Sequence, residues 1–370
     1  MSSGTPFGKH PDLLVRQQDP FNGGPPQQHV RRSFLTPKEL FFVRNHGAVP
    51  EVDLFSYRLT VAGRVKRPLR FSLEEIHRLP KVKVTATLQC AGNRRDELVR
   101  VAPIPHELEW HSEAISTAEW AGVRLRDLLA AVDPEADARH VAFVGLDETE
   151  RLGQRFCFGG SIPLDKALGP EVLLAYEMNG EPLPPVHGAP LRVVVPGYIG
   201  ARSVKWLSTV TLQGEPSDNY FQARAYRMFP PHIGRNGHDG VDWDSGLMLG
   251  ELSVSSVITS PLEGAELPAG AVTVQGWAMA GGGRTVARVD LSTDGGRTWT
   301  VAALQPDSRS GPWSWRLWEG RLELAPGAHE IVCRAWDSAT HTQPEDPAHV
   351  WNFKGYMNNA WHRVRVTCAG

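Results

Sequence analysis

One stretch of the chain places a lone thiol next to two guanidinium groups. The segment TLQCAGNRR begins at Thr87, and its Cys90 is followed by the small, turn-forming residues Ala-Gly-Asn and then by Arg94 and Arg95. Nearby positive charge favours a thiolate over a thiol. A thiolate beside arginines is suited to act as a nucleophile, or as a soft ligand for a metal that acts on an anion. Free cysteines are also common as packing residues, so three interpretations stay open.

The other cysteines argue against a metal site built from protein ligands alone. Cys157, Cys333 and Cys368 lie far along the chain from Cys90, and no two of the four form a C-x-x-C motif. Zinc and iron–sulfur sites need several Cys or His ligands at short spacing. A single ligand fits a metal carried by an organic cofactor that supplies the others. A nucleophile needs a positioned base, and fourteen histidines make one available by chance.

A second group of polar side chains surrounds glycines in HGAPLRVVVPGYIGARSVKWL. It contains His187, Arg192, Arg202, Ser203 and Lys205. Backbone N–H groups at glycines, guanidinium forks and an ammonium group can together cradle a phosphate. A glycine turn between strands, with solvated basic residues, explains the same composition. The segment is neither a G-x-G-x-x-G motif nor a Walker loop, so nucleotide binding is poorly supported.

Two further segments carry candidate polar residues. FFVRNH contains Arg44, Asn45 and His46, and YFQARAYRMF contains Tyr226 among arginines. Basic residues are common at helix C-termini, which offers a purely structural explanation for the first segment. The tyrosine is equally well explained as an ordinary half-buried residue.

Strands and short helices must position these groups. Alternating patterns predict strands at 57–65, 81–90 and 140–147, and a nearly continuous apolar run predicts a buried strand at 190–197. Capping residues and apolar spacing predict helices that begin at Thr36 and Ser72 and one over 122–132. Cys90 then lies at a strand end, where functional residues are common. The mixture predicts an α+β, or mixed α/β, domain over 36–250.

The composition changes at about Glu251, where helical patterns disappear. Short alternating runs follow, separated by turn residues, at 271–280, 286–304, 313–320 and 329–339. Asp294-Gly295-Gly296 between two such runs is a strong hairpin signal. Six or seven short strands in about 110 residues predict an immunoglobulin-like β-sandwich over 251–370.

Charge and the N-terminal sequence limit the partners and the compartment. The 370 residues include 39 Lys plus Arg and 41 Asp plus Glu, a formal net charge of −2, which gives no reason to expect nucleic acid or a membrane surface as a partner. Residues 1–35, rich in Pro, Gly and Gln, are predicted to be an extended surface arm. No secretory or membrane-spanning apolar run is found. We therefore expect a cytoplasmic protein, or a periplasmic one if a leader was removed.

Five segments together resemble the sulfite oxidase family of molybdenum enzymes, which also includes the molybdenum domain of assimilatory nitrate reductases. In the family's order they are FVRNH, TLQCAGNRR, VVVPGYIGARSVKWL, ELSVSSVITSP and NNAWHRVRV. The resemblance extends from about residue 41 to the C-terminus. It implies a molybdopterin-binding domain followed by an immunoglobulin-like dimerisation domain, and hence a homodimer.

The resemblance also implies a cofactor site. Cys90 would be the one protein ligand of molybdenum, with further sulfurs from the dithiolene of the pterin. Arg, Lys and Ser suit the cofactor's phosphate, while Asp and His suit the edges of its ring. The residues implied to hold the cofactor are Phe42, Val43, Arg44, Asn45, His46, Cys90, Asp147, His187, Arg192, Arg202, Ser203, Val204 and Lys205.

A substrate pocket formed by Arg44, Arg95, Trp110, Tyr226 and Lys354 is implied in the same way. Sulfite is a small dianion that needs cationic partners once it leaves water. Guanidinium groups suit its oxygens, Trp110 would wall the pocket, and Tyr226 would hydrogen-bond near the metal. The implied reaction is the oxidation of sulfite to sulfate by oxygen-atom transfer at a molybdenum-oxo centre.

Two positions depart from the animal members of the family. Lys354 stands in WNFKG where they carry arginine, and Ala225 precedes Tyr226 where they carry an acid. Lysine keeps the charge but loses the fork, which predicts weaker sulfite binding. Nitrate reductases also change pocket residues, so nitrate or another oxyanion is the alternative substrate, while Arg95 and Tyr226 favour sulfite. A non-enzymatic scaffold on the same fold is a third, disfavoured reading.

The electrons must leave the chain. No cytochrome b5-like HPGG segment and no C-x-x-C-H motif occurs, so no haem is expected here. The resemblance therefore implies a separate acceptor, such as a c-type cytochrome or oxygen.

Overall fold

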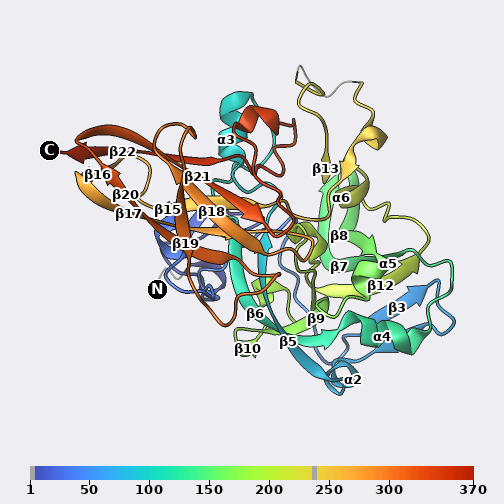
Figure 1. The fold of residues 1–370 in the computed structure, drawn as a ribbon. Helices are drawn as coiled ribbons and strands as arrows, with labels where there is room; N and C mark the ends of the chain where they lie inside the picture. The colour runs from blue at the N-terminus through green and yellow to red at the C-terminus, as the bar shows by residue number, and fades with distance from the viewer. Residues whose placement is uncertain (1–4, 236–239) are drawn as a thin grey trace.

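The computed structural model describes residues 5–235 and 240–370 and divides them into two sheet-rich parts (Figure 1). The first part contains two five-stranded sheets with short helices, and the second, coloured orange to red, is a sandwich of eight strands. The predicted order, an α+β domain followed by a β-sandwich, is confirmed. The boundaries at 35 and 250 stay predictions.

The first sheet leads to the predicted cysteine. Its order is β10-β9-β6-β5, with β11 also paired to β9, and all pairs are antiparallel. Strands β5 and β6 pair without a break up to Gln89 opposite Ile115, so Cys90 follows the last paired residue as predicted. The strands are β5 (Lys81–Gln89), β6 (Ile115–Arg124), β9 (Leu173–Met178), β10 (Glu181–Pro182) and β11 (Arg192–Val194).

The second sheet contains an irregularity that matters for the site. Its order is β4-β3-β12-β7-β8, in which β12 runs parallel to β3 and the other pairs are antiparallel. The register of β7 against β8 shifts between Val144 and Glu148, and such bulges redirect side chains. Asp147 lies within this shift. The strands are β3 (Leu59–Gly63), β4 (Leu69–Phe71), β7 (His140–Arg151), β8 (Gln154–Pro163) and β12 (Leu207–Gln213).

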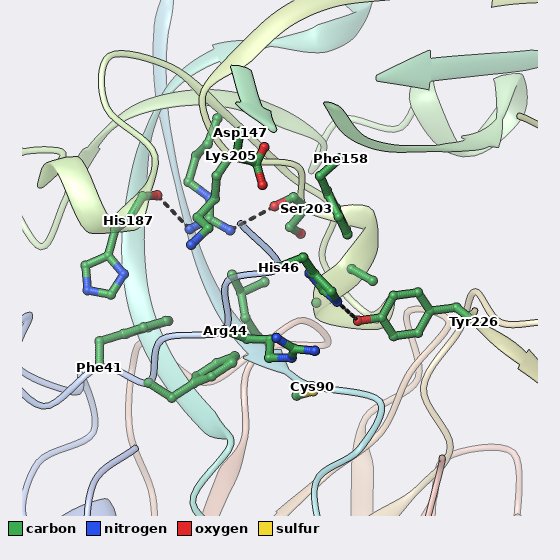
Figure 2. Close-up of a pocket in the computed structure, with 15 residues that line it drawn as sticks. Phe41, Arg44, His46, Cys90, Asp147, Phe158, His187, Ser203, Lys205 and Tyr226 are labelled. Carbon is green, nitrogen blue, oxygen red and sulfur yellow. Dashed lines mark hydrogen bonds between the residues drawn. The ribbon is translucent and has the colours of Figure 1, made fainter. Parts of the chain in front are cut away.

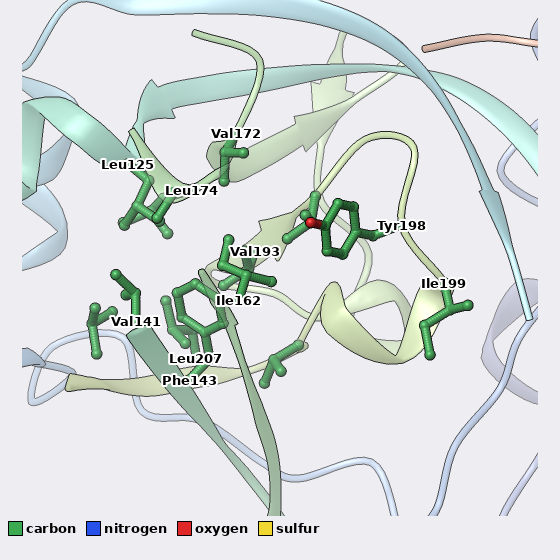
Figure 3. Packing of buried hydrophobic residues seen from close by; sticks show 14 of the residues in the cluster. Leu125, Val141, Phe143, Ile162, Val172, Leu174, Val193, Tyr198, Ile199 and Leu207 are labelled. Atoms are coloured by element: carbon green, nitrogen blue, oxygen red, sulfur yellow. The ribbon is translucent and has the colours of Figure 1, made fainter. Parts of the chain in front are cut away.

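The core of this part lies between the two sheets. Figure 3 shows side chains of β7, β8 and β12 meeting side chains of β9 and β11 and of helix α4 (Leu125–Val132). Burying each large apolar side chain stabilises the fold by about 1.5–3 kcal/mol. The fully buried members include Leu125, Val141, Phe143, Ile162, Leu174, Val193 and Leu207. This rigid core fixes the ends of the strands that carry the polar side chains.

Two of the three predicted helices form. Helix α2 (Leu73–His77) begins at Ser72, whose hydroxyl accepts from the Glu75 N–H while the Glu75 carboxylate accepts from the Ser72 N–H. Helix α4 begins three residues later than predicted, because 122–124 complete β6. The other helices are α3 (Arg95–Val101), α5 (Leu164–Ala167) and α6 (Tyr220–Ala223).

The helix predicted to begin at Thr36 is wrong. Only one turn forms, in which Leu40 and Phe41 donate to the carbonyl of Pro37. The next residues extend instead, because Val43 exchanges backbone hydrogen bonds with Gly23. Pairing with the N-terminal segment therefore overrides the local helix signal.

The N-terminal segment is not simply a surface arm. It forms β1 (Leu14–Gln17), β2 (Asn22–Gly24) and α1 (Gln27–Val30), and residues 21–26 are buried, as are Val30 and Phe34. The prediction that residues 1–35 lie on the surface is wrong for this stretch, since its apolar residues join the core. The first four residues of the predicted arm lie outside the described residues.

The second part is a sandwich whose eight strands form one continuous path with β15 and β16 at its ends. Strand β19 pairs with β18 on one side and with β20 on the other, which joins the two sheets. The predicted hairpin is present, with Gly295 and Gly296 at positive φ and Asp294 accepting from the N–H groups of Arg297 and Thr298. The strands are β15 (Ser255–Ser260), β16 (Ala265–Pro268), β17 (Gly270–Met279), β18 (Val286–Ser292), β19 (Thr300–Leu304), β20 (Arg316–Leu324), β21 (Gly327–Asp337) and β22 (His362–Ala369).

A pair of two-residue strands, β13 (Arg227–Met228) and β14 (Leu247–Met248), lies between the two parts in sequence. Over the described residues, none of the helices has the length and apolar character needed to cross a bilayer.

Candidate active site

Cys90 is held at the end of β5 by its backbone. Its N–H donates to the Ala114 carbonyl at 2.9 Å, and the Gly92 N–H lies 3.4 Å from its sulfur. A Cβ on Gly92 would come within 2.4 Å of the Arg95 guanidinium, so a larger residue here would displace that side chain. The thiol is 6% exposed and lines a cavity. The turn after β5 therefore presents one sulfur to an enclosed space.

The cavity that Cys90 lines is shown in Figure 2. It gathers polar groups from β5, β7, β11 and the segments before β3 and β12, which are far apart in sequence. Its lining residues are Phe41, Phe42, Arg44, His46, Leu88, Cys90, Asp147, Phe158, His187, Arg192, Gly200, Ala201, Ser203, Lys205 and Tyr226.

Two buried cations in the cavity donate to neutral oxygens. Arg192 donates to the carbonyls of His187 (2.9 Å) and Ser203 (3.0 Å), and Lys205 donates to the Val186 carbonyl (3.1 Å) and to the side-chain oxygen of Asn45. Among the described residues, no carboxylate lies within ion-pair distance of either. Burial lowers the pKa of Arg192 to about 9 and brings that of Lys205 well below its usual value. Neither cation therefore has an ion-paired carboxylate among the described residues, although the charge of Asp147 acts on Lys205.

Asp147 contributes an unused acceptor. It is 4% exposed, and its Oδ1 has no hydrogen-bond partner in the described part of the chain. Burial raises the pKa of Asp147 to about 7, against the opposing effect of Lys205. A buried polar atom without a partner is costly unless a ligand supplies one. The cavity thus offers an acceptor beside two donors that need an anion.

His46 and Tyr226 form a neutral pair. The Tyr226 hydroxyl lies 2.9 Å from Nε2 of His46, whose ring stacks on Phe158 at 4.7 Å (Figure 2). Burial, aided by the charge of Arg44, lowers the pKa of His46 well below its usual value, and burial raises the pKa of Tyr226. The hydrogen bond therefore joins an uncharged imidazole and an un-ionised phenol.

A second cavity shares Arg44 and His46 with the first. The segment before β22 brings Lys354 and Tyr356 to it, because Met357 donates to the Ala91 carbonyl beside Cys90. The C-terminal part thus completes the site. The lining residues are Gln17, Pro20, Arg44, Asn45, His46, His106, Glu107, Leu108, Arg151, Tyr220, Phe221, Ala225, Lys354 and Tyr356.

Most of the predicted residues come together, but not all face a cavity. Arg95 is held behind the lining by the carbonyls of Lys354 and Gly355, and fully buried Trp110 packs in the same apolar cluster as Cys90. The indole N–H of Trp110 has no partner among the described residues. Val43 and Val204 are buried packing residues that line neither cavity.

Arg202 is also outside both linings. Its guanidinium donates twice to the Leu249 carbonyl, at 3.1 and 2.8 Å, and once to that of Phe221, at 3.2 Å. The cofactor contact of Arg202 stays a prediction. These hydrogen bonds tie the glycine turn to α6 and to the residue after β14.

Several residues in or next to the cavity linings were missed from the sequence. Lys9 reaches Nε2 of His187 at 2.6 Å and donates to the carbonyls of Lys38 and Phe41. Phe41 borders the FVRNH segment, so its position was a usable signal. Nothing near Lys9 in the sequence marks it, because its role depends on the path of the N-terminal segment. Glu107 and Tyr356 were likewise unmarked.

The residues present fit a pterin cofactor that carries a metal and a phosphate. One soft sulfur, two cations without an ion-paired carboxylate among the described residues, and an orphaned acceptor line the same space. Among the described residues, no group of three or more His, Cys, Asp or Glu side chains is arranged to hold a metal ion.

Comparisons with known proteins bear on the same site. The family model described as the oxidoreductase molybdopterin binding domain matches residues 46–221, and the model of the Mo-co oxidoreductase dimerisation domain matches residues 247–369. Among solved structures, the sulfane dehydrogenase SoxCD from Paracoccus pantotrophus is similar with a TM-score of 0.77 at 27% identity, over 91% of this chain and 82% of that chain.

The chain is also similar to curated proteins. It is 47% identical to the mitochondrial sulfite oxidase of Macaca fascicularis, over 98% of this chain and 67% of that protein. It is 41% identical to the sulfite oxidase of Arabidopsis thaliana, over 96% of this chain and 94% of that protein. The nitrate reductase of Hordeum vulgare is 40% identical over 97% of this chain, but over only 42% of its own length. The chain spans about two thirds of the macaque protein.

Proposed function

Because the chain belongs to the sulfite oxidase family of molybdenum enzymes, we propose that it oxidises sulfite to sulfate with a molybdenum–molybdopterin cofactor. One observation carries the proposal: the buried Cys90 thiol shares a cavity with Arg192 and Lys205, two buried cations that have no ion-paired carboxylate among the described residues. A metal-bearing anionic cofactor satisfies both at once.

The residues that would hold the cofactor divide by chemistry. Cys90 would supply the thiolate ligand, and Arg192 and Lys205 would neutralise the phosphate. Asp147 would accept from the pterin ring through its unpaired oxygen. His187, kept neutral because burial and the charge of Lys9 lower its pKa, would offer a ring nitrogen. When bound, the cofactor supplies oxygen-atom transfer and takes up two electrons from sulfite.

The substrate side is built from cations and aromatic walls. Arg44 lines both cavities, so it is placed to hold an oxyanion next to the cofactor. Lys354 faces the second cavity. Arg95 lies behind the lining of that cavity, and the guanidinium of Arg95 lies 5.2 Å from the centre of the Tyr356 ring. The Tyr226–His46 hydrogen bond fixes the phenol at the edge of the first cavity. Fully buried Trp110 would exclude water from the thiolate side.

The electron acceptor, the quaternary structure and the compartment are further parts of the proposal. The match to a dimerisation domain supports a homodimer. We propose that electrons pass to a separate acceptor, a c-type cytochrome or oxygen, since no haem motif occurs in this chain. The cytoplasmic location stays a prediction, and the macaque relative is named as mitochondrial. Fractionation of the native host checks it.

Paired assays test the function. Purified holoenzyme is assayed with sulfite plus ferricyanide and with nitrate plus reduced viologen, while molybdenum is measured per chain. We expect turnover of sulfite and about one molybdenum per chain. Turnover of nitrate alone would reassign the enzyme to nitrate reduction. The similarity to the barley nitrate reductase is the reason for testing this alternative. Absence of molybdenum after expression in a cofactor-competent host would indicate a scaffold.

A further inference from the structure

A carboxylate lies among the cations of the second cavity. Glu107 forms an ion pair with the ammonium group of Lys354, and its Oε2 lies 3.8 Å from Nη2 of Arg95. The side chain of Glu107 is 17% exposed, that of Lys354 13%, and that of Arg95 3%. Charges so far removed from bulk water are weakly screened by salt and interact strongly.

Glu107 is the one acidic residue among the described residues that line this cavity. Arg44, Arg151 and Lys354 supply three positive charges to the same lining. Without Glu107 the cavity would present a concentrated positive field to any small anion. With Glu107 in place, part of that field is already neutralised by the protein.

The donors of Arg95 show which position the carboxylate fills. Its Nε donates to the carbonyls of Lys354 (3.2 Å) and Gly355 (3.1 Å), and its Nη1 donates to the carbonyl of Leu108. Its Nη2 faces Glu107. Glu107 therefore occupies two of the cationic groups at this cavity, Nη2 of Arg95 behind the lining and the ammonium of Lys354 in it.

This position lies beside the residues proposed to act on substrate. The ring of Tyr356 stacks on that of Tyr226, with 5.2 Å between the ring centroids, and the guanidinium of Arg95 lies over the ring of Tyr356 at 5.2 Å. Tyr226 also lines the cavity that contains Cys90. A carboxylate here competes directly with a substrate anion for the same cationic groups, which a distant surface charge would not do.

We propose that Glu107 is a resident counter-ion of the substrate pocket, which sulfite displaces from Arg95 and Lys354 on binding and which takes them back when sulfate leaves. The inference rests on the proposed function and adds the residue that sets oxyanion affinity. Glu107 is a positioning residue: it lowers the affinity for both anions equally and so favours release of a doubly charged product from a cationic site.

The test is Glu107→Gln in the holoenzyme, which keeps the shape and removes the charge. We expect the KM for sulfite and the inhibition constant of sulfate each to fall about tenfold at low ionic strength, with kcat within about twofold of wild type. The fall in KM should persist at high salt, because charges this far from bulk water are weakly screened. A fall in KM without a comparable change in kcat is a split that a merely structural role would not produce. Glu109→Gln is the matched control, since Glu109 is on the same loop but 56% exposed, and it should change neither constant.

An unchanged or raised KM for sulfite in Glu107→Gln, with normal thermal unfolding, would overturn the proposal. Glu107→Ser replaces it if the first variant does not fold. Titration of sulfate into each holoenzyme, followed by calorimetry, measures anion affinity without turnover. If wild type fails to oxidise sulfite, the proposed function falls, and this titration alone decides the role of Glu107: a tenfold tighter dissociation constant supports it, and an unchanged one refutes it.

Discussion

The two cavities that share Arg44 and His46 treat buried positive charge in opposite ways. In the cavity of Cys90, Arg192 and Lys205 donate only to carbonyl and amide oxygens of the described chain. In the other cavity, Lys354 has a carboxylate partner in Glu107. A buried cation without a counter-ion is costly, which suits an anion that stays bound. A cation that carries its own counter-ion suits an anion that exchanges. The difference separates a cofactor site from a substrate site.

The largest expected effect comes from the thiol that the first cavity presents. Cys90→Ser should reduce kcat with sulfite by at least about a thousandfold, because a hydroxyl is a poor soft ligand and several kcal/mol of transition-state stabilisation depend on the metal. The fold should survive, with a thermal unfolding midpoint within about 4 °C of wild type. Steady-state kinetics and circular dichroism measure the two quantities.

Cys157→Ser is the matched control for that variant. Cys157 is a half-buried free cysteine of β8 that lines neither cavity, so its replacement should leave turnover unchanged. Normal activity and metal content in Cys90→Ser would remove the basis for treating the first cavity as a metal site.

A second test removes an uncompensated cation from the same cavity. Lys205→Met should weaken cofactor retention about tenfold to a hundredfold, since a charge-assisted hydrogen bond to phosphate contributes about 1.5–3 kcal/mol. Molybdenum per chain and released pterin fluorescence after dialysis measure the loss. Lys66→Met is the control, because Lys66 is 64% exposed and outside both cavities. Equal cofactor content in the two variants would contradict the assignment.

The two cavities also show which features of the site could be predicted from the sequence and which could not. Local patterns placed Cys90 at the end of a strand and started α2 at Ser72, and the family resemblance to the sulfite oxidases is confirmed. The failures are tertiary. The helix signal at Thr36 lost to pairing of Val43 with the N-terminal segment. Whether a basic side chain faces a cavity depends on whether nearby backbone carbonyls in the folded structure already accept its hydrogen bonds.

Arg202 and Lys9 illustrate that last point from both sides. Arg202 lies beside Ser203 in the motif, yet the carbonyls of Leu249 and Phe221 occupy its donors. Lys9 lies in a Pro- and Gly-rich stretch without any motif, yet it contacts His187. No spacing rule within a few residues captures either contact, because the partners are brought in by distant parts of the chain.

A third test uses the pH dependence of Lys9. Its pKa is lowered to about 7 in the folded state because burial outweighs the effect of Glu39, whereas the unfolded chain has the ordinary value near 10.5. Between these values the unfolded state binds more protons, so the free energy of unfolding should rise with pH from about 7 to 10, by at most about 1.4 kcal/mol per unit. Below pH 7 this contribution to the slope vanishes.

Lys9→Met should therefore flatten the rise between pH 7 and 10, as measured by urea unfolding of cofactor-free protein. Lys38→Met is the control. Lys9 donates to the backbone carbonyl of Lys38, which the substitution keeps, and the replaced side chain is partly exposed. An identical slope in Lys9→Met and wild type would show that the N-terminal segment does not hold a buried amine against His187.

The smallest expected effect concerns Lys354 in the second cavity, where the substrate anion is proposed to exchange. Lys354→Arg should lower the KM for sulfite about threefold with kcat unchanged, because a guanidinium fork holds an oxyanion with two hydrogen bonds where an ammonium offers a point charge. Lys354→Gln separates charge from shape and should raise the KM. The gain from Lys354→Arg should be larger when combined with Glu107→Gln, because Glu107 otherwise engages the new fork as it engages Lys354. A KM that is unchanged by arginine in both backgrounds would mean that residue 354 does not touch the substrate.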